Sequence, residues 1–304
     1  MIAKEKNIFK ISALTIVVNL LLSLFKFFAG IVGHSEALFS DAIHSASDVF
    51  STIIVIIGVK ISNKQADASH QYGHEKFESL ATIILAIILF VTGIEIGKTG
   101  VLSLIHKSYL HKEIPTLITV VAASVSIVTK ESMFWYTRHG AKKNNSSALM
   151  ADAWHHRSDA LSSIGSLIGI LFARNGYPFM DPIASLVICL FIIKAAIDIL
   201  KDGTEKMVDH SCSDEDIKKI KEEILAIEGV DHIDSLKTRE FGDRSYVDVE
   251  IAADGNLSLY DSHAIAVRVH NQIEQVLPTV KHCMVHVNPI IAMGPLENKQ
   301  KGEK

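Results

Sequence analysis

The chain has 304 residues, of which 48% are hydrophobic, and its formal net charge at pH 7 is −4. So much apolarity is unusual for an ordinary soluble domain, and so small a net charge gives no reason to expect a nucleic-acid partner. Its three cysteines, Cys189, Cys212 and Cys283, are scattered without CxxC spacing. Neither a disulfide framework nor a thiolate zinc site is therefore expected.

The long apolar runs are concentrated between residues 9 and 200. A helix that spans a bilayer needs about 20 mostly apolar residues. Six segments meet this requirement: 9–32, 36–61, 78–104, 115–136, 148–172 and 180–200. Buried helices of a large soluble core are the alternative, which the repeated match to the spanning length disfavours. We therefore expect an all-α bundle of six transmembrane helices.

Lysine and arginine in the connecting loops predict how this bundle is oriented, because they collect on the cytoplasmic side of a membrane. One side has nine of them: Lys4, Lys6, Lys10, Lys60, Lys64, Lys76, Arg138, Lys142 and Lys143. The other side has Lys107, Lys112 and Arg174. This asymmetry predicts a multi-pass inner-membrane protein, in contact with lipid, whose N- and C-termini are both cytoplasmic.

The composition changes near Lys201, after which charged and apolar residues alternate as in a soluble domain. Helices are expected over 214–227 and 259–276, and strands over 232–240, 244–252 and 281–288. The first helix follows a Ser213–Asp216 capping signal. This order, αββαβ, predicts a small α+β domain. The expected division is 1–203 for the bundle, 204–292 for the α+β domain and 293–304 for a disordered tail.

Two histidine–aspartate pairs at identical spacing lie within the second and fifth spans, His44 with Asp48 and His155 with Asp159. A spacing of four places both side chains on one helix face. Ionisable groups inside a membrane are costly and usually mark a substrate path. Two imidazoles and two carboxylates match the ligands that a zinc-like dication accepts. Together the pairs predict a four-ligand transport site.

Each pair is preceded by another aspartate, Asp41 in the second span and Asp152 in the fifth. These residues are expected to act as partners of the ligands, by fixing imidazole tautomers or helix contacts. Two other interpretations fit the sequence less well. Polar stripes could hold helices together, but Ser or Thr would do so at a lower desolvation cost. An intramembrane metalloprotease needs His-Glu-x-x-His, which the sequence around His155 lacks.

The repeated His-x-x-x-Asp motif, the six spans and the C-terminal domain resemble the cation diffusion facilitator family over about residues 10–290. The segment from Gln65 to Ser79 and the Asp181-Pro182 start of the sixth span resemble its bacterial zinc and iron exporter branch. The resemblance implies a homodimeric, proton-coupled antiporter that exports a divalent metal, with a metallochaperone-like cytoplasmic domain and no enzymatic activity or cofactor. The double-histidine motif resembles zinc-selective members. Iron(II), manganese, cobalt or cadmium export, and a non-transporting metal-sensing scaffold, remain alternatives.

The same resemblance implies further metal positions and a charge pair that clamps the dimer. A lesser site is implied in the linker at Asp67, His70 and His74, with a solvated polar loop as the alternative. A cytoplasmic site is implied at Asp234, Glu250, His263 and His286, for which His232 and His282 could substitute, and which could otherwise be surface residues. Whether that site holds one metal or two is left open. Lys76 and Asp209 match the charge pair.

Overall fold

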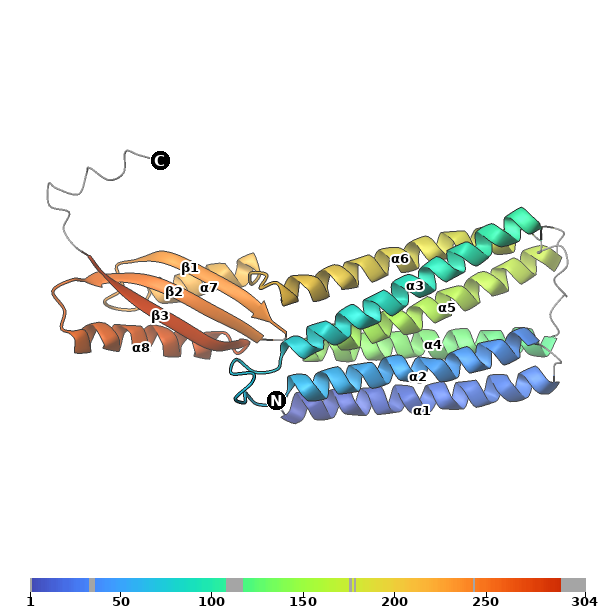
Figure 1. Cartoon of the computed structure of the whole chain (residues 1–304), viewed down its shortest axis with the longest axis horizontal. Coiled ribbons are helices and arrows are strands. Elements are labelled where there is room, and N and C mark those ends of the chain that lie inside the picture. The colour runs from blue at the N-terminus through green and yellow to red at the C-terminus, as the bar shows by residue number, and fades with distance from the viewer. Residues whose placement is uncertain are drawn as a thin grey trace. The chain divides into compact units, whose positions relative to one another are not determined.

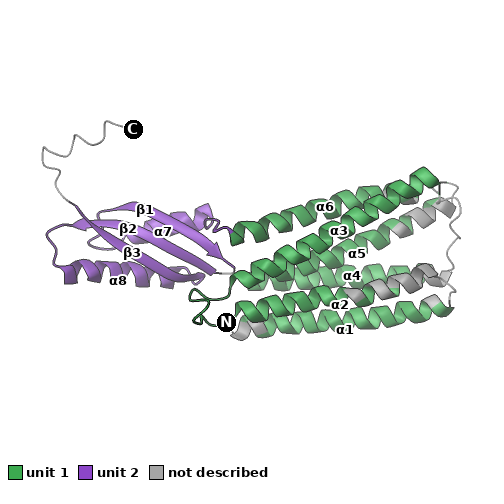
Figure 2. Cartoon of the chain, in the orientation of Figure 1, with its two compact units in different colours: residues 1–207 green, residues 208–304 purple. Residues whose placement is uncertain are grey.

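The computed structural model describes residues 2–32, 36–107, 117–174, 177, 179–242 and 244–290 (Figure 1). The chain forms two compact units, residues 1–207 and 208–304 (Figure 2). The boundary lies four residues beyond the predicted end of the bundle at residue 203. The tail that was expected to be disordered, 293–304, lies outside the described residues.

Unit 1 is an all-α bundle with the six helices predicted from the sequence. They are α1 (Ile2–Val32), α2 (Glu36–Ser62), α3 (Lys76–His106), α4 (Leu117–Asn144), α5 (Ser147–Arg174) and α6 (Met180–Met207). The helices α4 and α6 continue well past the predicted ends at 136 and 200, because the polar segments that follow contain no proline to stop them. In Figure 1, α1 lies beside α2, and α3 lies beside α6.

Close approach of α3 and α6 depends on glycines at the contact. A Cβ added to Gly93 would lie 2.9 Å from Cγ1 of Ile193, and one added to Gly97 would lie 2.9 Å from Sγ of Cys189. The spacing Gly93-x-x-x-Gly97 is the small-residue pattern that lets membrane helices pack backbone to backbone. Gly58 on α2 does the same against Ala81 on α3, where an added Cβ would lie 2.5 Å from the Ala81 Cβ.

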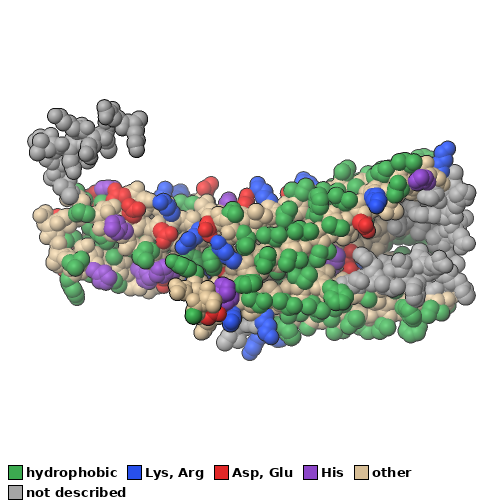
Figure 3. All heavy atoms as spheres, viewed as in Figure 1, with side chains coloured by type: hydrophobic (Ala, Val, Ile, Leu, Met, Phe, Trp, Pro, Cys, Tyr) green, Lys and Arg blue, Asp and Glu red, His purple; other side chains and the backbone are tan. Residues whose placement is uncertain are grey.

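The outer surface of the bundle is rich in apolar side chains, as one face shows in Figure 3. Leu24, Phe28, Leu190 and Phe191 are each more than half exposed, which suits contact with lipid rather than water. Two segments of the described chain, Lys6–Ala29 and the whole of α3, are long and apolar enough to cross a membrane by length and composition alone. Helices α4 and α5 are less apolar, because they carry several buried polar groups described below.

Unit 2 is the predicted α+β domain, with α7 (Asp214–Leu225), β1 (His232–Phe241), β2 (Arg244–Asp254), α8 (Leu259–Val276) and β3 (Val280–Ile290). The strand order is β1-β2-β3, with β1 antiparallel and β3 parallel to β2. Both helices pack on one face of the sheet, where Ile220 of α7, Val249 of β2 and Val269 of α8 share a buried core. The other face carries the polar residues that alternate with this core.

Gly58→Ala should destabilise the bundle, because the new Cβ meets another Cβ that cannot rotate away. We expect a loss of about 1–3 kcal/mol in unfolding free energy, the usual cost of overpacking. Gly203→Ala is the matched control, since its nearest atom is the rotatable Cγ1 of Ile83 at 3.0 Å. Thermal unfolding in detergent would measure both variants. Equal stability of Gly58→Ala and the unchanged protein would contradict the close packing of α2 on α3.

Candidate metal centre

Asp48, His155 and Asp159 converge inside the bundle, where α2 faces α5. One ligand atom from each residue lies within 4.8 Å of the others. Between these two helices, Nε2 of His155 lies 3.4 Å from Oδ1 of Asp48. All three residues are buried. Three of the four predicted transport ligands therefore lie together, at a separation that a single metal ion could bridge.

The fourth predicted ligand, His44, belongs to α2 one turn before Asp48. Its side chain lies outside the described part of the structure, and so does that of Asp41. The four-ligand cage and the role of Asp41 therefore stay predictions, supported here by their position on the helix that carries Asp48.

A buried lysine joins the two carboxylates, and the sequence motifs did not identify it. Nζ of Lys130, from α4, donates hydrogen bonds to Oδ2 of Asp48 and, at 2.9 Å, to Oδ2 of Asp159. Only 1% of Lys130 is exposed. We call this arrangement the Lys130 bridge. A second buried lysine, Lys26 of α1, donates to Oγ of Ser45 at 2.8 Å. A lysine near the middle of an apolar span was the available signal, but it has no spacing pattern to reveal its partners.

Asp152 contributes a contact between helices and not a contact to His155. Its carboxylate accepts a 3.2 Å hydrogen bond from the Thr52 hydroxyl and lies 3.6 Å from Nε2 of His156. Of the two roles considered from the sequence, the geometry favours the helix contact, since Asp152 ties α5 to α2. Within the described chain, Nδ1 of His155 is buried without a hydrogen-bond partner.

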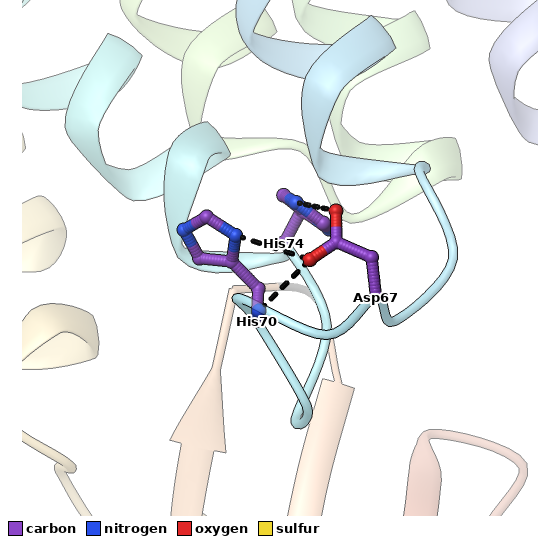
Figure 4. Close-up of side chains that lie close together, drawn as sticks. All are labelled: Asp67, His70 and His74. Carbon is purple, nitrogen blue, oxygen red and sulfur yellow. Dashed lines mark hydrogen bonds and ion pairs between the residues drawn. The ribbon is translucent and has the colours of Figure 1, made fainter.

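The linker between α2 and α3 gathers Asp67, His70 and His74 (Figure 4). The Asp67 carboxylate lies 3.5 Å from Nδ1 of His70 and 3.4 Å from Nε2 of His74. The two imidazole rings lie 4.5 Å apart between centroids. These three residues have ligand atoms within 4.8 Å of one another. The geometry suits the lesser metal site expected here, and that assignment remains a proposal.

Hydrogen bonds to the Asp67 carboxylate fix the shape of this linker. The backbone amide of His70 donates to Oδ1 at 2.9 Å, and the amide of Ser69 donates to the same oxygen at 3.0 Å. Chiefly because of the His70 amide, with help from Lys64, the pKa of Asp67 is lowered from 3.8 to about 2. The carboxylate is therefore charged at neutral pH, the form that both amides and a metal ion favour.

The predicted cytoplasmic ligands are only partly brought together. Glu250 and His286 are directly opposite on β2 and β3. Asp234 lies at an irregularity in the pairing of β1 with β2, and its Oδ2 accepts a 2.8 Å hydrogen bond from Asn288. This bond, and secondarily His232, lowers the pKa of Asp234. Among the described residues, no three of Asp234, Glu250, His263 and His286 form a compact ligand group, whereas His270, Glu274 and His282 do.

Lys76 and Asp209 are the residues expected to clamp a dimer. Lys76 is the first residue of α3, and Asp209 lies at the start of unit 2. Nζ of Lys76 donates to the backbone carbonyl of Met207 at 3.1 Å. Asp209 has a φ of 61°, a conformation that is uncommon outside glycine, although aspartate adopts it more readily than most residues. The Lys76–Asp209 pair itself remains a prediction.

Comparison with known proteins covers both units. Residues 12–208 match the family described as the cation efflux transmembrane domain, and residues 212–290 match the cytoplasmic domain of cation efflux proteins. An uncharacterised transporter of Methanocaldococcus jannaschii is 39% identical over 275 residues, which cover 90% of this chain and 96% of that protein. The manganese efflux system protein MneP of Bacillus subtilis is 32% identical over 287 residues, which cover 92% of this chain and 95% of that protein. The magnetosome protein MamB of Magnetospira sp. is 31% identical over 281 residues, which cover 90% of this chain and 92% of that protein.

Asp67→Ala should loosen the linker, because it removes the acceptor for two backbone amides. We expect faster hydrogen exchange at the Ser69 and His70 amides, measured by mass spectrometry on the whole protein. Asp254→Ala is the control, since Asp254 accepts from the Asn256 amide in a different loop and should leave the linker unchanged.

The pH dependence follows from the lowered pKa of Asp67. A carboxyl group with a depressed pKa contributes stability above its ordinary value of 3.8, and that contribution is lost as pH falls to about 2. After correction for intrinsic exchange, protection of the two amides should therefore persist from pH 7 to pH 4. Loss of protection between pH 7 and pH 5 would contradict the assignment.

Proposed function

The chain belongs to the cation efflux family, and we propose that this transporter exports a divalent transition metal, with zinc as its main substrate, in exchange for protons. The observation that carries the proposal is the buried convergence of Asp48, His155 and Asp159. Ionisable groups at membrane depth are costly and mark ion paths in membrane proteins. The members of the family named above are transporters and magnetosome proteins, which agrees with a role other than catalysis.

The ligand types support zinc. Imidazole nitrogen suits zinc, whereas sites made only of oxygen suit manganese. With His44 the proposed site has two imidazoles and two carboxylates, and the carboxylates offset the charge of the dication. Manganese is the second candidate, because relatives of this chain are named as manganese efflux proteins. Iron(II), cobalt and cadmium remain further alternatives.

Proton exchange follows from the same ligands. Histidine and carboxylate groups must be free of protons to bind a metal, so metal binding releases protons and protons compete with metal. Imidazole has a reference pKa of about 6.5, which makes this competition effective near neutral pH. A proton that enters from outside would then displace the metal outward.

The Lys130 bridge suggests how the charge of the two carboxylates is partly offset before metal arrives. An ammonium group held between two buried carboxylates occupies the place that a cation would take. Two carboxylates without a cation would be strongly destabilising at this depth. We propose that Lys130 serves as a tethered counter-cation, which the metal displaces on entry and which returns to the carboxylates after release.

The remaining parts of the proposal concern assembly and orientation. Similarity to the cytoplasmic domain of cation efflux proteins supports a homodimer joined in part through unit 2. The excess of lysine and arginine in the N-terminal segment, between the end of α2 and the start of α3, and at the C-terminal end of α4 supports cytoplasmic N- and C-termini in the inner membrane.

Asp159→Asn should reduce metal efflux to the background of empty vesicles, because it removes a charged ligand from the buried site. The measurement is zinc uptake into sealed inside-out vesicles with and without a pH gradient. Asp198→Asn on α6 is a control for charge loss outside the site. Wild-type flux in a well-folded Asp159→Asn protein would contradict the site. Zinc binding without any flux in the unchanged protein would favour the non-transporting scaffold.

His44→Asp should relax selectivity, because it replaces an imidazole nitrogen with oxygen. We expect the ratio of zinc flux to manganese flux to fall by at least about tenfold, or about 1.4 kcal/mol of discrimination. Competition between the two metals in the vesicle assay gives this ratio directly. An unchanged ratio would mean that His44 does not contribute to selectivity.

Lys130→Met should tighten metal binding at the membrane site, because the metal no longer competes with an ammonium group. The metal concentration for half-maximal flux should fall by about tenfold, and maximal flux should also fall, since release loses its returning cation. Lys130→Arg, which keeps the charge, should shift both quantities less. Weaker metal binding in Lys130→Met would mean that the lysine assists binding, and would overturn the counter-cation role.

A further inference from the structure

A histidine–glutamate pair on α8 lies beside a histidine on β3, within unit 2. His270 and Glu274 are four residues apart and therefore share one face of the helix. Nε2 of His270 lies 3.3 Å from Oε1 of Glu274. The His282 ring lies 5.8 Å from the His270 ring between centroids. One ligand atom from each residue lies within 4.8 Å of the others.

One of these imidazoles is held in the tautomer that metal binding requires. Nδ1 of His270 lies 2.6 Å from the backbone carbonyl of Cys283. A carbonyl oxygen only accepts hydrogen bonds, so Nδ1 carries the hydrogen, and in the neutral imidazole Nε2 then has the lone pair. The lone pair lies on the nitrogen that faces Glu274. In known sites the ligating histidine almost always donates its other nitrogen in this way.

We propose that His270, Glu274 and His282 form a metal site for a zinc-type dication, separate from the transport path. Two nitrogens and one carboxylate oxygen are typical zinc donors, and magnesium or calcium would require a site built of oxygen. Three protein ligands leave the fourth position to water. Because His270 and Glu274 keep about a third of their side-chain surface exposed, metal can exchange with the surrounding solution.

The neighbouring cysteine does not belong to this donor set. Cys283 is buried, and burial together with the charges of Glu274 and Asp248 raises the pKa of its thiol to about 12. Its side chain packs in the core of unit 2, and successive side chains of a strand point to opposite faces, so the sulfur points away from the side that carries His282. Its backbone carbonyl, and not its sulfur, contributes to the site by orienting His270.

This site is distinct from the cytoplasmic ligands expected from the sequence. His282 is opposite Tyr246, whereas His286 is opposite Glu250. Four residues along a strand correspond to about 13 Å, which is too far for one metal ion to contact both histidines. The two ligand sets can therefore be tested separately.

The ligands come from two elements, so bound metal would tie α8 to the β3 edge of the sheet. Metal that binds only this folded arrangement stabilises it in proportion to the metal concentration. Free metal in the surrounding solution would thereby fix the position of α8. This consequence does not depend on which ion the membrane site transports.

The test uses the whole protein in detergent, buffered free zinc as the probe, and diethyl pyrocarbonate labelling of histidines resolved by mass spectrometry. Zinc should protect His270 and His282 over the same concentration range. Glu274→Gln should shift that range upward by at least about tenfold. Glu215→Gln, at an exposed position on α7, is the matched control and should not shift it. The labelling of His210 provides an internal reference.

A double variant, His263→Ala with His286→Ala, separates this site from the other predicted ligands. Protection of His270 and His282 that survives in this variant supports the proposal. Two results would overturn the proposal. One is protection that is lost in the double variant but kept in Glu274→Gln, and the other is labelling of His270 and His282 that does not change at any zinc concentration.

The variant His282→Ala gives a second, independent test by equilibrium dialysis. It should bind one zinc ion fewer per chain, and an unchanged zinc stoichiometry would contradict the site. Circular dichroism confirms that each variant is folded.

Discussion

The arrangement of the bundle interior depends on the Lys130 bridge. It joins α2, α4 and α5 through one ammonium group and two carboxylates, all almost completely buried. Removal of one partner from such a group leaves an uncompensated charge and costs several kcal/mol. If a metal ion displaces Lys130 from Asp48 and Asp159, as proposed above, its departure must restore the bridge. Binding and release would in this way be linked to the relative positions of three helices.

The rest of unit 1 keeps these helices at the required separations. Gly58 brings α2 close to α3, and Gly93 and Gly97 bring α3 close to α6. Asp152 joins α5 to α2 through Thr52, which lies one turn after Asp48 on α2. Because protein interiors are close-packed, small displacements of one helix are transmitted to its neighbours. The site thus lies where a change of ligand can alter the packing of several helices.

Sequence patterns predicted the helices, the strands and the helix faces that carry the candidate membrane site, because each depends on spacing within one element. The His-x-x-x-Asp repeat places Asp48, His155 and Asp159 on helix faces, and the structure brings them together. The Lys130 bridge was missed because its partners come from other helices. His270, Glu274 and His282 were not recognised as a group for a similar reason, since the contact depends on how α8 packs against β3. No spacing in the sequence encodes that packing.

The central claim is that zinc and Lys130 compete for the same two carboxylates. X-ray absorption at the zinc edge tests it most directly, in a protein whose linker and unit 2 histidines have been replaced so that only the membrane site retains metal. We expect zinc to be coordinated by two imidazole nitrogens and two carboxylate oxygens. Zinc should occupy the membrane site at a lower concentration in the Lys130→Met protein than in the same protein with Lys130. A shell without imidazole, or occupancy that does not respond to Lys130→Met and Asp159→Asn, would contradict it.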